Sequence, residues 1–181
     1  MKQQMAVQVS SEELSWITPP EIIERVRKVL GGYIDLDPAS SAEANSIIKA
    51  NRYYTESDDM FKQDLTCDTI YMNPPFGKVG NKSQAGIFTR HVLSCYTAGK
   101  VKYGGIILIM SRFGYDWFED ILDIATSATL KKRIKFINPK TMKQSAQAKT
   151  AQTLFCFGNS TIIENFIEEF KTDARIFNPS K

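Results

Sequence analysis

Residues 69–77 read Thr69-Ile70-Tyr71-Met72-Asn73-Pro74-Pro75-Phe76-Gly77, and this stretch decides which fold the chain can adopt. The first four residues are apolar or β-branched and predict a buried strand. The two prolines lack amide hydrogens and end that strand. Ligands of open α/β sheets bind at the carboxyl ends of the strands, so we expect a site at Asn73.

The segments on both sides of this strand alternate between helix and strand patterns. Pro19 and Pro20 begin a run of apolar residues at helical spacing that stops at Gly31, which predicts a helix over 19–30. The nearly continuous apolar run 104–110 is typical of a central strand covered on both faces. Similar patterns predict strands at 33–37, 69–72, 129–137 and 150–158, helices at 41–50, 84–98, 115–125 and 162–170, a loop with a short strand or turn at 51–65, and a loop at 77–86. This order indicates an α/β fold with a largely parallel sheet, helices on both faces and a last strand pair that can be antiparallel.

Length and composition favour one domain over residues 1–181, without a separate large target-recognition domain. Hydrophobic residues make up 43% and charged residues 24%, which excludes a disordered chain. No apolar run of about 18 residues and no leader pattern is present, so we expect a cytoplasmic protein that does not span a membrane. Three cysteines without a close pair and the single His91 argue against disulfides and against a metal site. A monomer is slightly favoured over an oligomer.

Charge is distributed unevenly along the chain. Residues 1–68 carry a net charge of −5 and residues 69–181 a net charge of +8. Thirteen lysines and arginines lie in the two stretches 69–115 and 124–163, which contain no acid. This pattern predicts contact with the phosphates of a nucleic acid, although an ordinary solvated face is the alternative. The best candidates are Lys78, Lys82, Arg112, Lys131, Lys132, Arg133, Lys143 and Lys149.

The Asn-Pro-Pro-Phe segment carries the clearest chemical signal. Two prolines fix the backbone, so the side-chain oxygen of Asn73 and the carbonyl of Pro74 can form a pair of outward acceptors. Such a pair binds both hydrogens of an NH2 group and turns its lone pair toward an electrophile. Phe76 offers a flat surface for stacking a base. The sequence therefore predicts that Asn73, Pro74, Pro75 and Phe76 act on an amine, a rigid strand-ending turn being the alternative.

Acidic residues near two strand ends are candidates for ligand binding. Asp35 and Asp37 close the strand before Pro38, and the small residues that follow let a ligand approach the backbone. A carboxylate there can pair with an ammonium group or bind ribose hydroxyls, or it can simply cap a turn. Asp59 and Asp64 could accept from an adenine amine, or they could be solvated loop acids.

Nearly the whole chain resembles the phage-type, Dam-like DNA N6-adenine methyltransferases of bacteriophages. The resemblance is carried by Trp16-Ile17-Thr18-Pro19-Pro20, by 31–40 with its Leu-Asp-Pro-Ala-Ser, by Ala44-Asn45, Lys49-Ala50, Tyr53-Tyr54-Thr55 and Asp58-Asp59, by Asn73-Pro74-Pro75-Phe76-Gly77, and by Trp117-Phe118, 133–136 and 155–158. It implies a Rossmann-like methyltransferase fold that uses S-adenosylmethionine to methylate adenine N6 in DNA, on a base flipped out of the duplex. The cofactor-binding residues that follow from the strand-end acids and the resemblance together are Trp16, Thr18, Pro19, Asp35, Asp37, Pro38, Ala39, Ser40, Asp59 and Asn73.

The chain departs from the family pattern at three positions. Met60 stands where the family has Gly and Leu65 stands near a usual Trp, which leaves open whether Asp59 or Asp64 contacts the cofactor adenine. Phe76 replaces the commoner Tyr, and we expect this to be tolerated because stacking needs only the ring. Site preference would come from the loops 77–86 and 138–150. Alternative functions are methylation of cytosine N4, of an RNA adenine or of a protein glutamine, and an inactive nucleic-acid-binding module.

Overall fold

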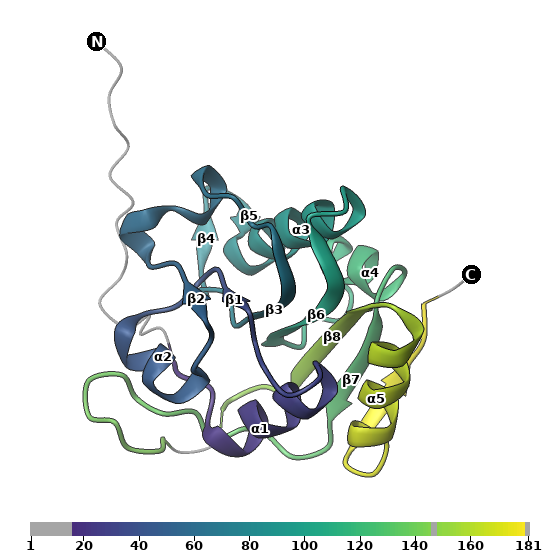
Figure 1. Ribbon diagram of the computed structural model, residues 1–181. Coiled ribbons are helices and arrows are strands. Elements are labelled where there is room, and N and C mark those ends of the chain that lie inside the picture. The colour runs from purple at the N-terminus through teal and green to yellow at the C-terminus, as the bar shows by residue number, and fades with distance from the viewer. Residues whose placement is uncertain (1–15, 146–147, 180–181) are drawn as a thin grey trace.

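A seven-stranded sheet lies between two layers of helices in the computed structural model, which describes residues 16–145 and 148–179 (Figure 1). The helices are α1 (Pro20–Val29), α2 (Ala42–Ile48), α3 (Gln84–Thr97), α4 (Asp116–Leu122) and α5 (Ser160–Phe170), with two single-turn 3-10 helices at Glu56–Asp58 and Met60–Lys62. The sheet strands are β1 (Leu36–Asp37), β2 (Arg52–Tyr53), β3 (Cys67–Met72), β6 (Val101–Met110), β7 (Thr126–Leu130), β8 (Gln152–Gly158) and β9 (Ala174–Phe177), and a separate hairpin consists of β4 (Lys78–Val79) and β5 (Lys82–Ser83).

The strand order is β2-β1-β3-β6-β8-β7-β9. Strands β2, β1, β3 and β6 are parallel neighbours, and β8 lies antiparallel between β6 and β7. Strand β9 extends the edge antiparallel to β7. Five of the seven strands share one direction, so the predicted mostly parallel α/β architecture is confirmed.

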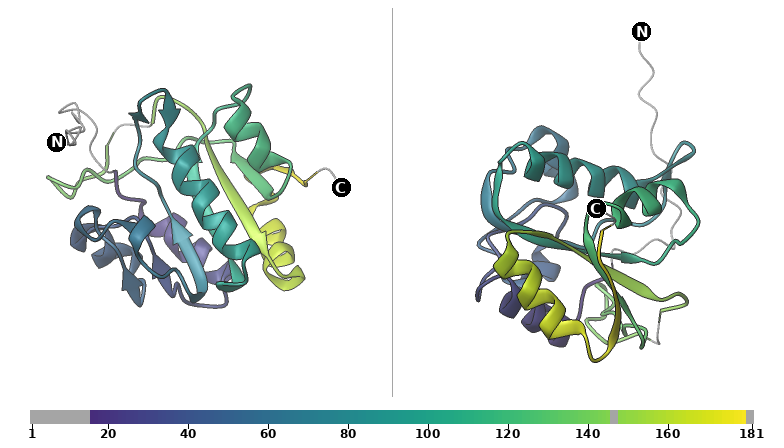
Figure 2. Two further views of the ribbon diagram at one scale, coloured as in Figure 1. Left: turned by 90° about the horizontal axis from the view of Figure 1, so that it is seen from above. Right: turned by 90° about the vertical axis from the view of Figure 1, so that its right-hand side faces the viewer.

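Alternating side chains of the central strands form two apolar cores. Tyr71, Ile106 and Leu108 belong to the core under α1 and α5. Ile107 and Ile109 belong to the core under α3 and α4 on the opposite face. Figure 2 (right) shows these helix layers on either side of the sheet. Because every residue of such a strand is covered, its sequence reads as a continuous apolar run.

The order of the strands reverses next to β1. From β1 the chain crosses through α2 to β2 on one side, and it then returns to β3 on the other side, where Leu36 pairs with Ile70. The carboxyl ends of β1 and β3 are therefore neighbours at a switch point, the usual position of a ligand site in this architecture. Asp37 and Asn73 come to the same edge, as the sequence predicts.

Three predictions about elements need correction. The strand predicted at 129–137 occupies Thr126–Leu130, and residues 131–145 leave the sheet, folding back on themselves through a bridge between Ile137 and Gln144. The loop predicted at 77–86 contains the β4–β5 hairpin, and β9 was not predicted. Strand β9 and both strands of the hairpin have four residues or fewer, too few to show a clear strand pattern in the sequence. No helix in the described part of the chain is long and apolar enough to cross a membrane.

Candidate active site

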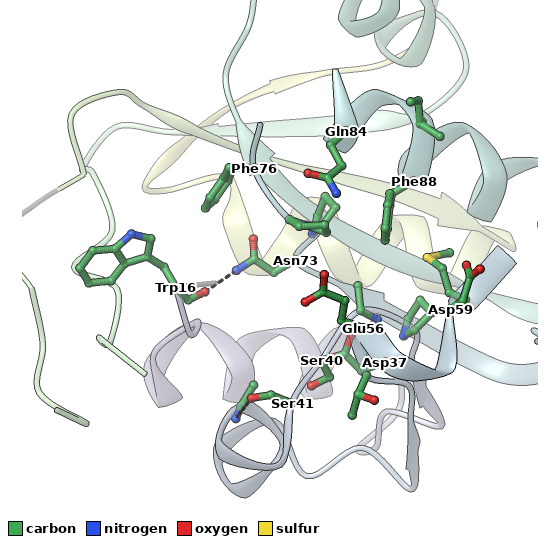
Figure 3. Close-up of a pocket in the computed structure, with 18 of the residues that line it drawn as sticks. Trp16, Asp37, Ser40, Ser41, Glu56, Asp59, Asn73, Phe76, Gln84 and Phe88 are labelled. Atoms are coloured by element: carbon green, nitrogen blue, oxygen red, sulfur yellow. Dashed lines mark hydrogen bonds between the residues drawn. The ribbon is translucent and has the colours of Figure 1, made fainter. Parts of the chain in front are cut away.

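A cavity of about 980 Å³ opens at the switch point between the carboxyl ends of β1 and β3 (Figure 3). Its lining includes most of the residues predicted to bind or react: Trp16, Thr18, Asp37, Pro38, Ala39, Ser40, Asp59, Asn73, Pro74, Pro75 and Phe76. These residues come from segments up to about sixty positions apart, and the sheet topology brings them together.

Asn73 presents a free acceptor to the cavity. Its side-chain nitrogen donates to the Trp16 carbonyl at 2.8 Å, which fixes the orientation of the amide. Its Oδ1 is buried and has no hydrogen-bond partner among the described residues. The Pro74 carbonyl likewise accepts no hydrogen bond from the described part of the chain. A buried polar group without a partner is costly, so a ligand that donates here would be bound favourably.

The segment that orients Asn73 is itself anchored. Ile17 exchanges two backbone hydrogen bonds with Ile137, at 3.0 and 2.9 Å. The buried hydroxyls of Thr18 and Tyr71 are 2.7 Å apart, which ties the same segment to β3. Trp16 therefore holds the Asn73 amide from a backbone with three independent attachments.

Asp37 is buried at the end of β1. Its side chain is close to fully inaccessible, and Oδ1 accepts from the Ala39 amide at 3.2 Å. Burial raises the pKa of this carboxyl to about 7, while the nearby Ser40 hydroxyl and the Ala39 amide oppose the increase. The Ser40 hydroxyl makes no hydrogen bond of ordinary geometry and is buried. This carboxyl lacks a cation, and a cationic ligand group would stabilise its ionised form.

The structure separates the two candidate acids of the 51–65 segment. Asp59 lines the cavity, with a left-handed backbone at φ 54° and an ion pair to Lys62 at 2.8 Å. Asp64 does not line it and instead binds Thr66 and pairs with Lys100 at 3.6 Å. The geometry therefore favours Asp59 as the residue facing a ligand.

Two predicted cofactor residues lie outside the cavity lining. Asp35 precedes β1 and accepts from the Asp68 amide at 2.9 Å, and it pairs with Arg52 at 3.3 Å. Pro19 is buried and is the N-cap residue directly before α1. Only Asp37 reaches the carboxyl end of the strand, so the prediction for Asp35 is corrected to a structural contact between strands.

Several cavity residues were not predicted. Glu56 lines the cavity just after β2, Phe61 lines it from the 3-10 helix Met60–Lys62, and Gln84 and Phe88 line it from α3. Phe61 and Phe88 pack edge to face with ring centroids 4.9 Å apart. The sequence predicted only a short strand or turn somewhere in 51–65, and without the position of β2 at Arg52–Tyr53 it did not indicate Glu56 as a strand-end residue.

The predicted phosphate-binding residues divide into groups. Lys78 lines the cavity, and Lys82 lies on the same hairpin, while Arg112 follows the carboxyl end of β6. The others lie on the 131–150 segment, which adjoins the cavity through the bridge of Ile137 to Ile17: Lys131, Lys132, Arg133, Lys143 and Lys149. Within that segment, Lys131 donates to the Thr172 carbonyl and Arg133 to the Lys149 carbonyl.

Three further cations of the acid-free stretches do not face the site. Lys100 and Lys102 flank the start of β6, at the opposite edge of the sheet, and lie within 4 Å of Asp64 and Asp68. Arg90 pairs with Asp120 of α4 at 2.5 Å. The positive surface near the cavity is therefore smaller than the sequence stretch that predicts it.

Nucleophile chemistry has little support in this site. The three cysteines are free and buried, and burial raises the pKa of the Cys67 thiol to about 12. His91 is absent from the cavity lining, and burial lowers its pKa. The described residues contain no group of three His, Cys, Asp or Glu side chains that could hold a metal ion.

The cavity fits S-adenosylmethionine, the cofactor that the resemblance implies. Its volume is large enough for a nucleoside cofactor and a second planar group. Among the described residues, the buried carboxyl of Asp37 has a backbone hydrogen bond but no ion pair, and the Ser40 hydroxyl has no partner, so an ammonium or hydroxyl group could bind to both. Glu56 and Asp59 add acceptors on the same side of the cavity (Figure 3).

Comparison with known proteins gives one match. A family model described as DNA N-6-adenine-methyltransferase (Dam) matches residues 6–173. No curated protein and no solved structure matches the chain.

Proposed function

The chain belongs to the DNA N-6-adenine-methyltransferase (Dam) family, and from this premise we propose that its cavity transfers a methyl group from S-adenosylmethionine to adenine N6 in DNA. One observation carries the proposal: among the described residues, the buried Oδ1 of Asn73 has no hydrogen-bond partner, and the neighbouring carbonyl of Pro74 accepts no hydrogen bond. Two fixed acceptors fit the two hydrogens of one exocyclic amine. A DNA substrate also supports the cytoplasmic location expected from the sequence.

Asn73 and Pro74 activate the amine by position. The N6 lone pair of adenine is delocalised into the ring, which makes this nitrogen a poor nucleophile. Two acceptors that bind both hydrogens favour a pyramidal nitrogen with its lone pair directed at the methyl group. S-adenosylmethionine supplies that methyl group on a positively charged sulfur, so no covalent enzyme intermediate is needed. The contribution of the protein is mainly orientation.

The cofactor would occupy the side of the cavity formed by the β1 edge. Asp37 and Ser40 would face its polar groups, and Glu56 and Asp59 would accept from hydroxyl or amine groups. Asn73 stands between this side and the Phe76 side (Figure 3). This arrangement places the acceptor pair where a base and a cofactor would meet.

The base would enter from the duplex by rotation about its backbone. A paired adenine has its N6 inside the base stack and cannot reach Asn73, so flipping is required. Phe76 is only partly buried and provides the ring on which a flipped base stacks. Lys78 at the cavity and Lys82 nearby are placed to bind the flanking phosphates.

Incubation with unmethylated DNA and methyl-labelled S-adenosylmethionine tests the reaction, with nucleoside digestion and mass analysis as the readout. We expect label in N6-methyladenine. Label in N4-methylcytosine would show that the target base is cytosine and not adenine. Binding of the cofactor without labelled DNA would direct the search to RNA or a protein amide, and absence of cofactor binding would support the inactive-module alternative. Sequencing of the labelled DNA then maps the preferred site.

Asn73→Ala tests the acceptor pair directly. We expect transfer to fall by at least about a hundredfold, the effect of losing one fixed group that orients a reacting atom. Cofactor affinity, measured by calorimetry, should stay close to that of the wild type. Asn51→Ala is the matched control, because Asn51 is exposed just before β2, away from the cavity. Unchanged turnover in Asn73→Ala would reject this role. A thermal melt shows whether a loss of activity comes instead from destabilisation after the loss of the Trp16 contact.

A further inference from the structure

Gln84 faces the same space as the acceptor pair. It is the first residue of α3, is partly buried and lines the cavity. Figure 3 shows its amide pointing into the cavity between the rings of Phe76 and Phe88, on the side to which the Asn73 oxygen also points. A hydrogen-bonding side chain thus accompanies the acceptors next to the stacking surface.

The backbone of Gln84 is fixed, whereas its side chain is available. Its amide nitrogen donates to the Gly77 carbonyl at 3.0 Å, which closes the chain around the β4–β5 hairpin. Ser83 caps the helix and accepts from the Gly86 amide at 3.3 Å. No hydrogen bond joins the Gln84 side chain to any of the described residues. Such a side chain, fixed at its base and unpaired at its tip, is suited to reading a ligand.

We propose that Gln84 donates a hydrogen bond to ring nitrogen N1 of the target adenine while Asn73 and Pro74 hold N6. This inference rests on the proposed function and adds a residue that reads the base. The Watson–Crick edge of adenine carries an amine donor beside a ring acceptor. Two acceptors at Asn73 and Pro74 and a donor at Gln84 match that edge.

The same acceptor pair rejects two of the other bases. Guanine and thymine present a carbonyl where adenine has N6, and an N–H where adenine has N1. Their carbonyl would face the Asn73 and Pro74 oxygens, whereas the Gln84 amide can turn its own oxygen toward their N–H, so Asn73 and Pro74 are what exclude them. Unpaired groups of this kind in a buried site are strongly unfavourable. Cytosine shares the amine-and-acceptor pair with adenine, so its exclusion depends on other contacts.

A substrate with N1 removed tests the proposal. Two duplexes carry the mapped target site with either adenine or 1-deazaadenine, in which a C–H replaces N1, and kcat/KM is measured for wild type and for Gln84→Ala. We expect the ratio of kcat/KM on adenine to kcat/KM on 1-deazaadenine to be about tenfold larger for the wild type than for Gln84→Ala. A factor of this size is the effect of one hydrogen bond of ordinary strength. Gln84→Glu keeps the shape but presents a carboxylate to N1, and it should lose activity on adenine more than on 1-deazaadenine.

Lys82→Gln is the control for an effect on DNA binding alone. It lies on the neighbouring strand β5 and should lower kcat/KM on both duplexes by the same factor. An equal preference for adenine in wild type and Gln84→Ala would overturn the inference, and so would a Gln84→Ala protein that loses cofactor affinity instead. Failure of the wild type to methylate adenine would reject the proposed function itself, so the two failures are distinguishable. Thermal melts verify that each variant is folded.

Discussion

Asn73 and Asp37 lie at neighbouring strand ends, and each buries a polar group that the described chain satisfies only in part. Asn73 leaves Oδ1 free, and Asp37 buries a carboxyl without a cation. Both arrangements cost folding free energy, because buried polar groups are stable only when they are paired. A cavity in which this cost is concentrated is suited to a ligand that brings a donor and a positive charge.

Stability should therefore depend on pH through Asp37. Burial raises its folded-state pKa to about 7 from a usual value near 3.8, so between these values the folded state holds a proton that the unfolded state releases. The free energy of unfolding consequently falls as pH rises through this window. Asp37→Asn should remove the penalty and stabilise the ligand-free protein at pH 8 by about 1–3 kcal/mol, with little effect at pH 4. Urea unfolding at the two pH values measures the difference.

Asp64→Asn is the matched control for this prediction. Asp64 is exposed, and its hydrogen bond from Thr66 lowers its pKa. Its replacement should leave the protein slightly less stable at pH 8, the opposite sign to Asp37→Asn. Equal pH profiles for wild type and Asp37→Asn would show that Asp37 is ionised in the folded protein without cost.

At the scale of elements, two irregular pieces border the cavity. The β4–β5 hairpin carries Lys78 and Lys82, and the 131–150 segment adjoins Trp16 through the bridge between Ile17 and Ile137. Neither piece contributes a strand to the main sheet. Both present basic side chains at the carboxyl edge, and Ile134 and Phe136 of the second piece also belong to the core under α1 and α5.

The 131–150 segment should contribute to DNA affinity through phosphates alone. Lys143 and Lys149 are exposed on it, and we expect Lys143→Gln with Lys149→Gln to weaken binding to all DNA sequences alike. The slope of log affinity against log salt should become shallower by up to about two units. Fluorescence anisotropy at several salt concentrations measures it. The control is the double variant Lys100→Gln with Lys102→Gln, which removes the same charge at the opposite edge and should leave the slope unchanged. An equal change of slope in the two double variants would show that the 131–150 segment does not contact DNA.

At the scale of the whole molecule, Arg25 joins the first helix to the last. Its guanidinium donates to Glu169 at 2.9 Å and to Asp173 at 2.7 and 2.9 Å, and it lies 4.1 Å from the centre of the Phe170 ring. α1 begins directly after the segment that orients Asn73. The contact thus connects the site to the C-terminal part of the fold.

Arg25→Ala should lower the free energy of unfolding by about 2 kcal/mol, because it leaves two partly buried carboxylates without their main partner. The hydrogen bond from Arg25 holds the pKa of Asp173 below its usual value. The stabilisation by the Arg25–Asp173 contact is therefore present above the usual carboxyl range and lost as pH falls through the pKa of Asp173.

Lys28→Ala is the control, because Lys28 is exposed and pairs with the same Glu169. It should cost under about 1 kcal/mol. Equal losses in urea unfolding would contradict the assigned role of Arg25.

The sequence predicted the α/β class, the order of the main helices and strands, and the meeting of Asp37 with Asn73. It did not predict β9 or the hairpin, and it extended one strand into 131–137. Long apolar runs identify buried strands by themselves, whereas two-residue strands and polar edges form only where a neighbour supplies hydrogen-bond partners.

What the sequence by itself determined is the local chemistry: a strand that is followed by an amide side chain, two prolines and an aromatic ring in a fixed order. These features depend on backbone geometry within a few residues. Only the tertiary structure decided that Asp59 rather than Asp64 faces the cavity, that Asp35 lies outside it, and that Gln84 lies inside. The physical reason is that the packing of distant segments around the switch point decides whether a side chain faces the cavity. The residues next to that side chain in the sequence do not determine this packing.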